Sequence, residues 1–227
     1  MGGHIFYKCL ELSEVYLPSD LEVIPEYSFA YTQSLKSITL HGSITDIGEY
    51  AFYSSGLEKI STPESCKTIK EYAFAKCTNL SEIVFAEGLE KIEEFAFSNT
   101  ALKNVILPKG LRSLGREVFY IDGVYSNSII ETIYIPDGID EGFWCPVESS
   151  SRALTHIYFQ GDSTKWQKYV QESYDNYWYF DEDIGELEDT GWYDFDCVYF
   201  YSKEKPKAPG KYWHYVDGKI TVWTYEE

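Results

Sequence analysis

Phenylalanine recurs at intervals of 22 or 23 residues along the first half of the chain, at Phe6, Phe29, Phe52, Phe74, Phe97 and Phe119. The residues between these positions repeat in the same frame. One unit reads Leu80, Ile83, Phe85, Leu89, Ile92, Ala96 and Phe97, and the same seven positions recur, with few substitutions, in five units between about Leu12 and Phe119. A period of this length is typical of folds built by stacking one small unit on the next.

Each repeat is predicted to contain one short β-strand. Ile83 and Phe85 are two residues apart, so their side chains share one face of a strand and Val84 points to the other. Leu89 and Ile92 then turn inward on the returning arm of the coil. One unit buries too little apolar surface to be stable alone, so the units must stack. We predict a β-rich solenoid with one short parallel strand per 22–23-residue repeat and a step of about 4.8 Å per coil.

The regular repeat ends after Phe119. Strand positions return with irregular spacing as far as Phe159, so residues 1–159 are predicted to form the solenoid and residues 160–227 an acidic, aromatic C-terminal cap. A cap is needed because the end of a solenoid exposes apolar core and strand edges. Within 160–227 we predict a short helix with Ser163 or Thr164 as its N-cap, and strands at 197–202 and 212–223. The second strand is folded by an Asp217-Gly218 turn.

These residues resemble a known family. The stretch from Leu80 to Phe97, with Ala73-Phe74…Cys77-x-x-Leu80 as its most recognisable piece, is similar to the BspA-type leucine-rich repeat of bacterial surface proteins. The tail from Tyr199 to Trp223 resembles the C-terminal segment of members from Gram-positive gut bacteria. The resemblance covers roughly residues 5–159 and implies a right-handed leucine-rich-repeat coil. It also implies a cell-surface or secreted location and a role in binding host proteins. The start of the chain, Met1 to His4, carries no recognisable signal peptide.

The charge balance limits the partners. Nineteen basic and 37 acidic residues give a net charge of −18, which disfavours nucleic acid and anionic membranes and favours a cationic or neutral partner. No run of 18 apolar residues is present, so we predict no membrane insertion. We expect a monomer that binds protein or glycan.

No catalytic, cofactor-binding or metal-binding motif is evident, so we predict a non-enzymatic protein without a cofactor. Asp181-x-Asp183-x-Gly185 matches only the first two ligand positions of an EF-hand loop, and a solvated acidic loop is the favoured interpretation of the region around it. The five cysteines are predicted to be free, with Cys9, Cys66 and Cys77 packed in the solenoid.

The outward strand position is the candidate partner-binding surface. It contains, in order, Tyr16, Thr39, Ser61, Val84, Ile106, Tyr134 and Tyr158. We predict that the last four, Val84, Ile106, Tyr134 and Tyr158, form an exposed apolar stripe that binds a protein. The alternatives are that β-branched and aromatic residues occur there simply because they suit strands, or that the cap folds over them.

Two alternatives to a protein-interaction or adhesion module remain. A carbohydrate-binding module would stack sugar rings on exposed tryptophans of the C-terminal region, which are Trp166, Trp178, Trp192, Trp213 and Trp223. A purely structural repeat spacer would bind no ligand. The exposure of the tryptophans separates the first of these from the protein-binding hypothesis.

Overall fold

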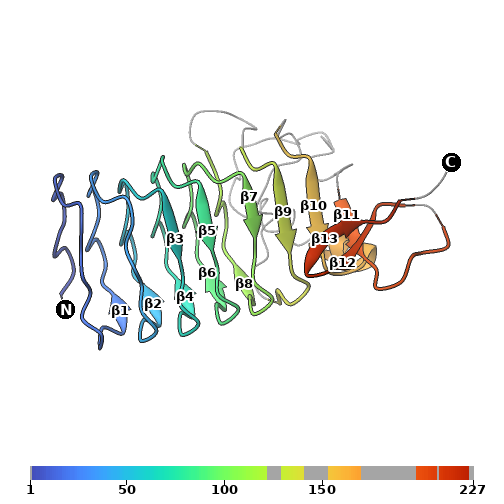
Figure 1. The fold of residues 1–227 in the computed structure, drawn as a ribbon, viewed down its shortest axis with the longest axis horizontal. Helices are drawn as coiled ribbons and strands as arrows, with labels where there is room; N and C mark the ends of the chain where they lie inside the picture. Colours follow the sequence, from blue (N-terminus) through green and yellow to red (C-terminus); the bar gives the residue numbers. More distant parts are fainter. Residues whose placement is uncertain (1, 122–128, 141–152, 170–197, 209, 225–227) are drawn as a thin grey trace, which may run out of the picture.

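The computed structural model describes residues 2–121, 129–140, 153–169, 198–208 and 210–224. The coils lie side by side along the long axis, with the N-terminus at one end and a β-hairpin at the other (Figure 1). The β-rich solenoid predicted from the repeat is confirmed.

The predicted strand position forms one side of the coils. It contains β3 (Lys59–Ser61), β5 (Glu82–Val84), β7 (Asn104–Ile106), β9 (Thr132–Ile135) and β10 (His156–Phe159). Register is kept from coil to coil: Ile60 pairs with Ile83, and Val105 with Ile133. We call the outer side of these strands the strand face.

A second parallel ladder runs along the returning arm of the coils. Its strands have two residues each: β1 (Val23–Ile24), β2 (Asp46–Ile47), β4 (Thr68–Ile69), β6 (Lys91–Ile92) and β8 (Ser113–Leu114). They form one sheet in the order β1-β2-β4-β6-β8. The structure therefore adds a second short strand to the single strand predicted for each repeat, because the inward-facing residue of this arm (Ile92 in the fourth unit) also stacks in register.

The repeated phenylalanines form the centre of the core. Their rings stack along the axis with centroids 5.0 to 5.9 Å apart, from Phe6 to Phe119. The preceding small residues, such as Ala51 and Ala73, are fully buried. The turn that holds each ring donates backbone hydrogen bonds to the next coil, as from Phe52 N to Ala73 O at 2.7 Å. Ring stacking and backbone pairing together fix one coil on the next.

The C-terminal strands extend the same sheet. β11 (Val198–Tyr201) pairs in parallel with β10, β12 (Tyr212–Val216) pairs with β11, and β13 (Lys219–Val222) returns antiparallel to β12. Both predicted strands are present, and the turn uses left-handed conformations at Asp217 (φ 50°) and Gly218 (φ 76°). β10 and β11 thus pair across the predicted boundary at residue 159.

A short helix at 163–169 follows β10. Its N-cap is Asp162, whose Oδ1 accepts a hydrogen bond from Lys165 N at 2.9 Å, so the predicted caps Ser163 and Thr164 are one and two residues too late. Nearly half of the predicted cap, including 170–197 and the acidic segment with Asp181 and Asp183, lies outside the described residues. In the part of the chain that the structure describes, no helix combines the length and apolarity needed to cross a membrane.

Candidate interaction surfaces

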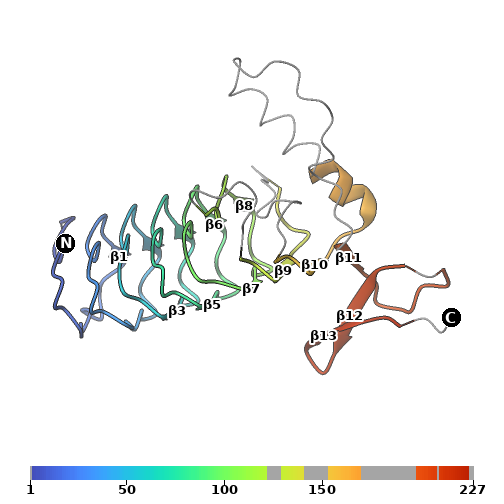
Figure 2. The same ribbon diagram turned by 90° about the horizontal axis from the view of Figure 1, so that it is seen from above.

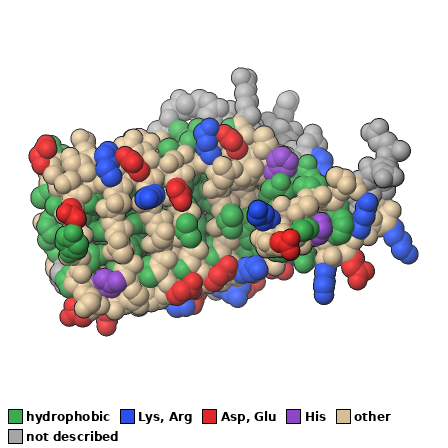
Figure 3. Space-filling model, in the orientation of Figure 1, with side chains coloured by type: hydrophobic (Ala, Val, Ile, Leu, Met, Phe, Trp, Pro, Cys, Tyr) green, Lys and Arg blue, Asp and Glu red, His purple; other side chains and the backbone are tan. Residues whose placement is uncertain are grey.

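The strand face is exposed along the middle of the solenoid. Val84 and Ile106 are 53% and 66% exposed, and Thr39 and Ser61 on neighbouring coils are also exposed. Tyr16, nearer the N-terminal end, is 85% exposed, and its hydroxyl donates a hydrogen bond to Glu14 at 2.5 Å. Figure 3 shows this side of the molecule, where green apolar side chains reach the surface between charged groups. Two of the four predicted binding residues are therefore accessible.

Tyr134 is a correction to the predicted exposed stripe. Its side chain is only 2% exposed, its ring lies 5.5 Å from that of Trp213 in an edge-to-face contact, and its hydroxyl donates to Gln160 Oε1. Burial and the neighbouring Tyr215 raise its pKa. The reason is tertiary: two side chains of β12, Trp213 and Tyr215, lie against Tyr134 and cover the outward position at this coil.

Tyr158 is half-buried at the same junction. Its ring packs against Tyr199 on β11, 5.7 Å away between centroids, and against Trp213 at 6.0 Å. Burial raises the pKa of its hydroxyl, with a smaller contribution from Tyr199. Tyr158 is thus packed against the C-terminal strands and stacked on His156, and it remains only partly exposed.

The β12–β13 hairpin itself adds exposed apolar surface beside the strand face. In Figure 2 it extends past the side of the solenoid that carries β3 to β10. Tyr215 is 37% exposed, and Lys109 Nζ lies 5.3 Å from the centre of its ring. Tyr215 lies beside Tyr134, and Tyr134 on β9 is the register partner of Ile106 on β7. Tyr215 therefore borders the exposed residues of the strand face. We call Val84, Ile106, Tyr158 and Tyr215 the junction patch.

The described tryptophans of the C-terminal region are packed. Trp213 is fully buried and its Nε1 donates to Phe159 O at 3.0 Å, and Trp166 is 6% exposed. Trp223 stacks on His214 with ring centroids 3.6 Å apart and donates to Ser202 O at 3.1 Å. Trp178 and Trp192 lie outside the described residues. Trp166 and Trp213 are therefore closed to a sugar ring, and one face of Trp223 is occupied.

The cysteines are free where they are described. Cys66 and Cys77 are buried as predicted, whereas Cys9 is exposed, so the prediction that it is packed is wrong. Burial raises the pKa of Cys66 to about 12 and that of Cys77 to about 11. Cys145 and Cys197 lie outside the described residues.

A second surface, which the repeat pattern did not predict, lies on the turn before each phenylalanine. Rings at this position stack along the axis, with centroids 4.7 Å apart from Tyr27 to Tyr50, 4.8 Å from Tyr50 to Tyr72 and 5.0 Å from Tyr72 to Phe95. A glutamate precedes each ring in the sequence. We call this set the turn ladder: Glu26, Tyr27, Glu49, Tyr50, Glu71, Tyr72, Glu94 and Phe95. The recurring pair of a glutamate and an aromatic residue before each Ala-Phe or Ser-Phe is the signal that could have located it.

The backbone of the turn ladder is unusual. All four aromatic residues adopt the left-handed region, with φ between 53° and 55°, where non-glycine residues are uncommon. His4 extends the stack at the N-terminal end with φ 66°, 4.7 Å from Tyr27. Stacking the rings offsets the cost of this conformation, which is on the order of 1 kcal/mol per residue.

The electrostatics of the turn ladder reflect its aligned carboxylates. Burial and the carboxylates of Glu49, Glu94 and Glu93 raise the pKa of Glu71 above its ordinary 4.5. Burial, the two neighbouring rings and the carboxylates of Glu71 and Glu49 raise the pKa of Tyr50 to about 12. The ladder is thus a row of neutral aromatic rings beside negative charges that repel one another. Across the described ranges, no group of three or more His, Cys, Asp or Glu side chains is placed to hold a metal ion.

The repeat architecture matches a known protein family. Residues 1–123 match the model of the BspA type Leucine rich repeat region in six copies. No curated protein matches the chain.

Among solved structures, a leucine-rich repeat protein from Bacteroides ovatus is 23% identical with a TM-score of 0.39, over 69% of this chain and 51% of that one. A leucine rich cell surface protein from Faecalibacterium prausnitzii is 24% identical with a TM-score of 0.42, over 73% of this chain and 64% of that one. The pneumococcal vaccine antigen PcpA is 22% identical with a TM-score of 0.45, over 82% of this chain and 38% of that one.

The alignment thus spans about half the length of the Bacteroides ovatus protein. The family match covers 123 of the 227 residues, over the coils that carry the phenylalanine stack and the turn ladder. The chain therefore belongs to the BspA type leucine-rich repeat family.

Proposed function

We propose that this chain is a protein-interaction module of a bacterial cell-surface protein and that it binds its partner through the junction patch. The observation that carries the proposal is the exposure of Val84 on β5 and Ile106 on β7, two strands that are in contact on neighbouring coils, beside the aromatic hairpin. Exposed contiguous apolar groups on a folded surface are characteristic of binding sites.

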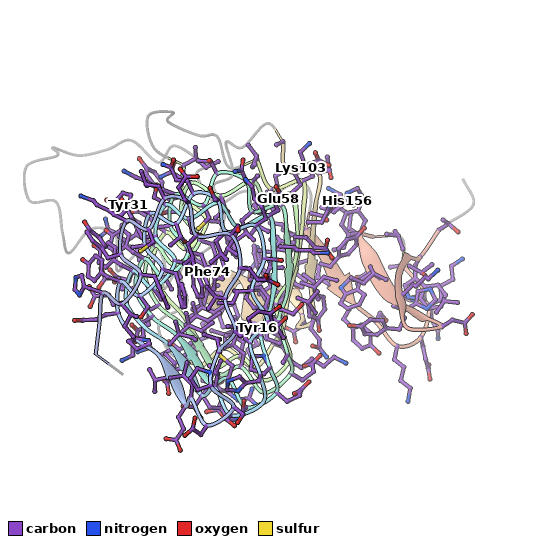
Figure 4. All side chains as sticks on the ribbon, turned by 60° about the vertical axis from the view of Figure 1, so that its left-hand side comes forward. Tyr16, Tyr31, Glu58, Phe74, Lys103 and His156 are labelled. Carbon is purple, nitrogen blue, oxygen red and sulfur yellow. The ribbon has the colours of Figure 1, made fainter. Side chains whose placement is uncertain are left out.

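The form of the patch suits a protein partner. Its centre is apolar, and charged pairs lie around it, such as Lys103 with Glu131 at 2.8 Å and Lys36 with Glu58 at 3.7 Å. An apolar centre with a polar rim is the usual arrangement of protein interfaces. Figure 4 shows Glu58 and Lys103 on this same side of the coil. Tyr158 and Tyr215 would serve as aromatic anchors at the C-terminal end of the patch.

The surface location and the adhesive role are proposed from similarity to other repeat proteins. The Faecalibacterium prausnitzii relative is described as a cell surface protein, and repeat solenoids of this kind generally bind proteins on an extended face. We propose by analogy that this chain is exported and that its partner is a host surface or matrix protein. The high pKa values of the buried Cys66 and Cys77 thiols mark these two residues as packing residues rather than nucleophiles.

A binding screen tests the proposal. The purified chain is assayed by biolayer interferometry against a panel of purified matrix and host surface proteins, and in parallel on a glycan array. We expect a protein hit whose affinity falls about tenfold in the double variant Val84→Ser/Ile106→Ser, because two exposed apolar contacts are removed. Val23→Ser, which changes an exposed valine on the other ladder, is the matched control and should bind like the parent.

The other outcomes separate the alternatives. A protein hit that both variants retain would place the binding site elsewhere than the junction patch. Glycan hits without protein hits would favour the carbohydrate-binding module. A chain that binds neither class would favour the structural spacer.

A further inference from the structure

We propose that β13 accepts an acidic, extended segment of a partner protein as an additional strand. Among the described strands, β13 (Lys219–Val222) is the outermost of its sheet, which has the order β13-β12-β11-β10-β9-β7. An edge strand offers backbone N–H and C=O groups to which another chain can add. The junction patch consists of side chains, whereas this site consists of backbone groups, so the inference goes beyond the proposed function and does not rest on it.

The pairing of β13 with β12 determines which backbone groups face outward. Trp223 N donates to Tyr212 O at 2.9 Å, so this pair is hydrogen-bonded, and the next pair in the register is Trp213 with Val222. Hydrogen-bonded and non-hydrogen-bonded pairs alternate along an antiparallel ladder. The N–H and C=O groups of Val222 and Ile220 therefore point away from β12. In the described part of the chain, no backbone hydrogen bond from outside the sheet reaches either residue.

The edge itself is open to strand addition. Native proteins often block an edge strand with a proline or a bulge. β13 contains no proline, and its four residues pair with β12 in continuous register, without a bulge. The two outward-facing residues thus present two donors and two acceptors in a regular strand.

Lysines lie at both ends of this edge. Five of the chain's 19 basic residues lie between 203 and 219, with two acidic residues among them, and all five are exposed. Lys219 begins β13. The other four lie in the loop that starts at Ser202, whose carbonyl accepts a hydrogen bond from Trp223 Nε1 at 3.1 Å, beside the end of β13. Figure 3 shows blue side chains gathered at this end of the molecule. The edge is therefore locally basic in a chain whose net charge is −18.

Four of these lysines are not neutralised by neighbours. In the ranges that the structure describes, none of the ion pairs includes Lys203, Lys207, Lys211 or Lys219. On the solenoid, by contrast, lysines pair with glutamates of the neighbouring coil, as Lys67 does with Glu90 at 2.7 Å. An acidic segment laid along β13 would gain charge attraction in addition to its backbone hydrogen bonds.

The same charges argue against a second copy of this chain as the occupant. Antiparallel pairing of two β13 strands would place the start of each strand beside the end of the other. Lys219 of each copy would then lie next to the lysine-containing loop of its partner, and like charges on neighbouring strands are destabilising. The charge at the edge thus favours an acidic partner strand.

Peptides that differ only in backbone methylation test the inference. The probe is a fluorescein-labelled (Glu-Val)4 peptide, and its binding to the full chain is followed by fluorescence anisotropy. In one comparison peptide the glutamates are N-methylated, and in the other the valines are. Only alternate N–H groups of a strand point to its neighbour, so we expect one methylated peptide to bind about tenfold more weakly and the other to stay within about threefold of the probe. Equal affinities of the two methylated peptides would overturn the inference, because charge attraction alone does not distinguish them.

A proline substitution at the edge localises the binding. Val222→Pro removes an outward N–H and leaves the hydrogen bonds from β13 to β12 in place, since proline is tolerated where the N–H of an edge strand faces solvent. It should weaken probe binding about tenfold, whereas Val222→Ala, which shortens the same side chain and keeps the N–H, should stay within about threefold. Hydrogen exchange over Tyr212–Val216 checks that the hairpin is intact. Equal binding by the two variants would overturn the assignment to β13.

Charge variants provide a second test that leaves the backbone unchanged. Lys203→Gln/Lys207→Gln/Lys211→Gln/Lys219→Gln should weaken probe binding by about tenfold. Lys36→Gln/Lys59→Gln/Lys70→Gln/Lys91→Gln changes four exposed lysines of the solenoid by the same net charge and should leave binding within about twofold. Equal losses in the two variants would contradict a local role of the hairpin lysines.

Two further measurements separate this site from other interactions. A dimer of the parent chain that dissociates in Val222→Pro, measured by analytical ultracentrifugation, would assign the edge to a second copy and overturn the inference. The junction variant Val84→Ser/Ile106→Ser should bind the probe like the parent, so this test stands or fails apart from the proposed function.

Discussion

At the scale of single residues, stacking identical coils places like side chains on top of one another. For apolar residues this is favourable, as the stacked rings of Phe52 and Phe74 at 5.1 Å show. For charged residues it is not, because each carboxylate of the turn ladder lies next to another. Glu71 is the most affected, since it is flanked by Glu49 and Glu94 and is also partly buried.

The raised pKa of Glu71 predicts a pH-dependent effect of Glu71→Gln. The protonated side chain is favoured in the folded state, so its contribution to stability is complete below pH 4.5 and is lost as the pH rises through the higher folded-state pKa. Glutamine mimics the protonated form. We expect Glu71→Gln to raise the melting temperature at pH 7 and to leave it nearly unchanged at pH 4, measured by circular dichroism.

Glu82→Gln is the control for this substitution, because Glu82 is exposed on β5 and away from the ladder. It should change the melting temperature little at either pH. An effect of Glu71→Gln that is the same at pH 4 and pH 7 would mean that loss of charge repulsion is not its cause.

The thiols differ in reactivity for the same local reasons. Cys77 Sγ donates to Phe52 O at 3.0 Å and is fully buried, and Cys66 is likewise enclosed, whereas Cys9 is exposed. Since the thiolate is the reactive form, iodoacetamide at pH 8 should alkylate Cys9 quickly and Cys66 and Cys77 only after unfolding. Peptide mapping by mass spectrometry gives each rate separately. Alkylation of Cys77 at the rate of Cys9 in the native protein would contradict the described packing.

At the scale of elements, the β12–β13 hairpin decides which part of the strand face is accessible. Trp213 is its anchor: it is fully buried, packs against Tyr134 and Tyr158, and donates a hydrogen bond to the backbone of β10. The hairpin is therefore held both by the pairing of β12 with β11 and by this one large buried side chain, while its own turn is set by Asp217 and Gly218.

Replacing this anchor should loosen the hairpin and leave the solenoid folded. Trp213→Ala removes a buried aromatic side chain, a change that typically costs about 3–5 kcal/mol. We expect hydrogen exchange to rise over 212–222 and over Thr132–Ile135, and to stay unchanged over β1 to β6, when measured by mass spectrometry. Trp223→Ala, at a half-buried ring on the outer strand, is the control and should have a smaller effect over β9. Protection of β9 that survives in Trp213→Ala would show that other contacts cover Tyr134.

Local sequence pattern was sufficient to predict the coils but not what covers them. The inward residues of the strand face, Ile60, Ile83 and Ile133, follow from spacing alone, because stacking repeats the same neighbour in every coil. The burial of Tyr134 does not follow from spacing, since it depends on a contact with Trp213, 79 positions later in the chain. The turn ladder was missed for another reason: Tyr27, Tyr50 and Tyr72 occupy a left-handed conformation that propensity rules assign to glycine or asparagine.

At the scale of the whole molecule, the charged residues behind the net charge of −18 are arranged differently on different sides of the coils. On the strand face and the returning arm, neighbouring coils place opposite charges together, as for Lys67 with Glu90 at 2.7 Å and Lys103 with Glu131 at 2.8 Å. On the turn ladder, neighbouring coils place carboxylates beside carboxylates. Solenoid stability should therefore depend on salt mainly through the turn ladder.

Salt should stabilise the parent chain and stabilise the ladder variant less. The Debye length falls from roughly 30 Å at 0.01 M to about 3 Å at 1 M ionic strength, and the latter is shorter than the step between coils. Raising NaCl over this range should raise the melting temperature of the parent chain, because repulsion between Glu26, Glu49, Glu71 and Glu94 is screened. The fourfold glutamine variant at these positions should melt higher than the parent at low salt, and the two curves should converge at 1 M. A control variant with glutamine at Glu11, Glu14, Glu22 and Glu82 has the same net charge. It therefore separates the effect of the aligned carboxylates from the effect of the total charge. If both fourfold variants shift the salt dependence equally, the repulsion is a property of the whole acidic surface and the turn ladder has no special part in it.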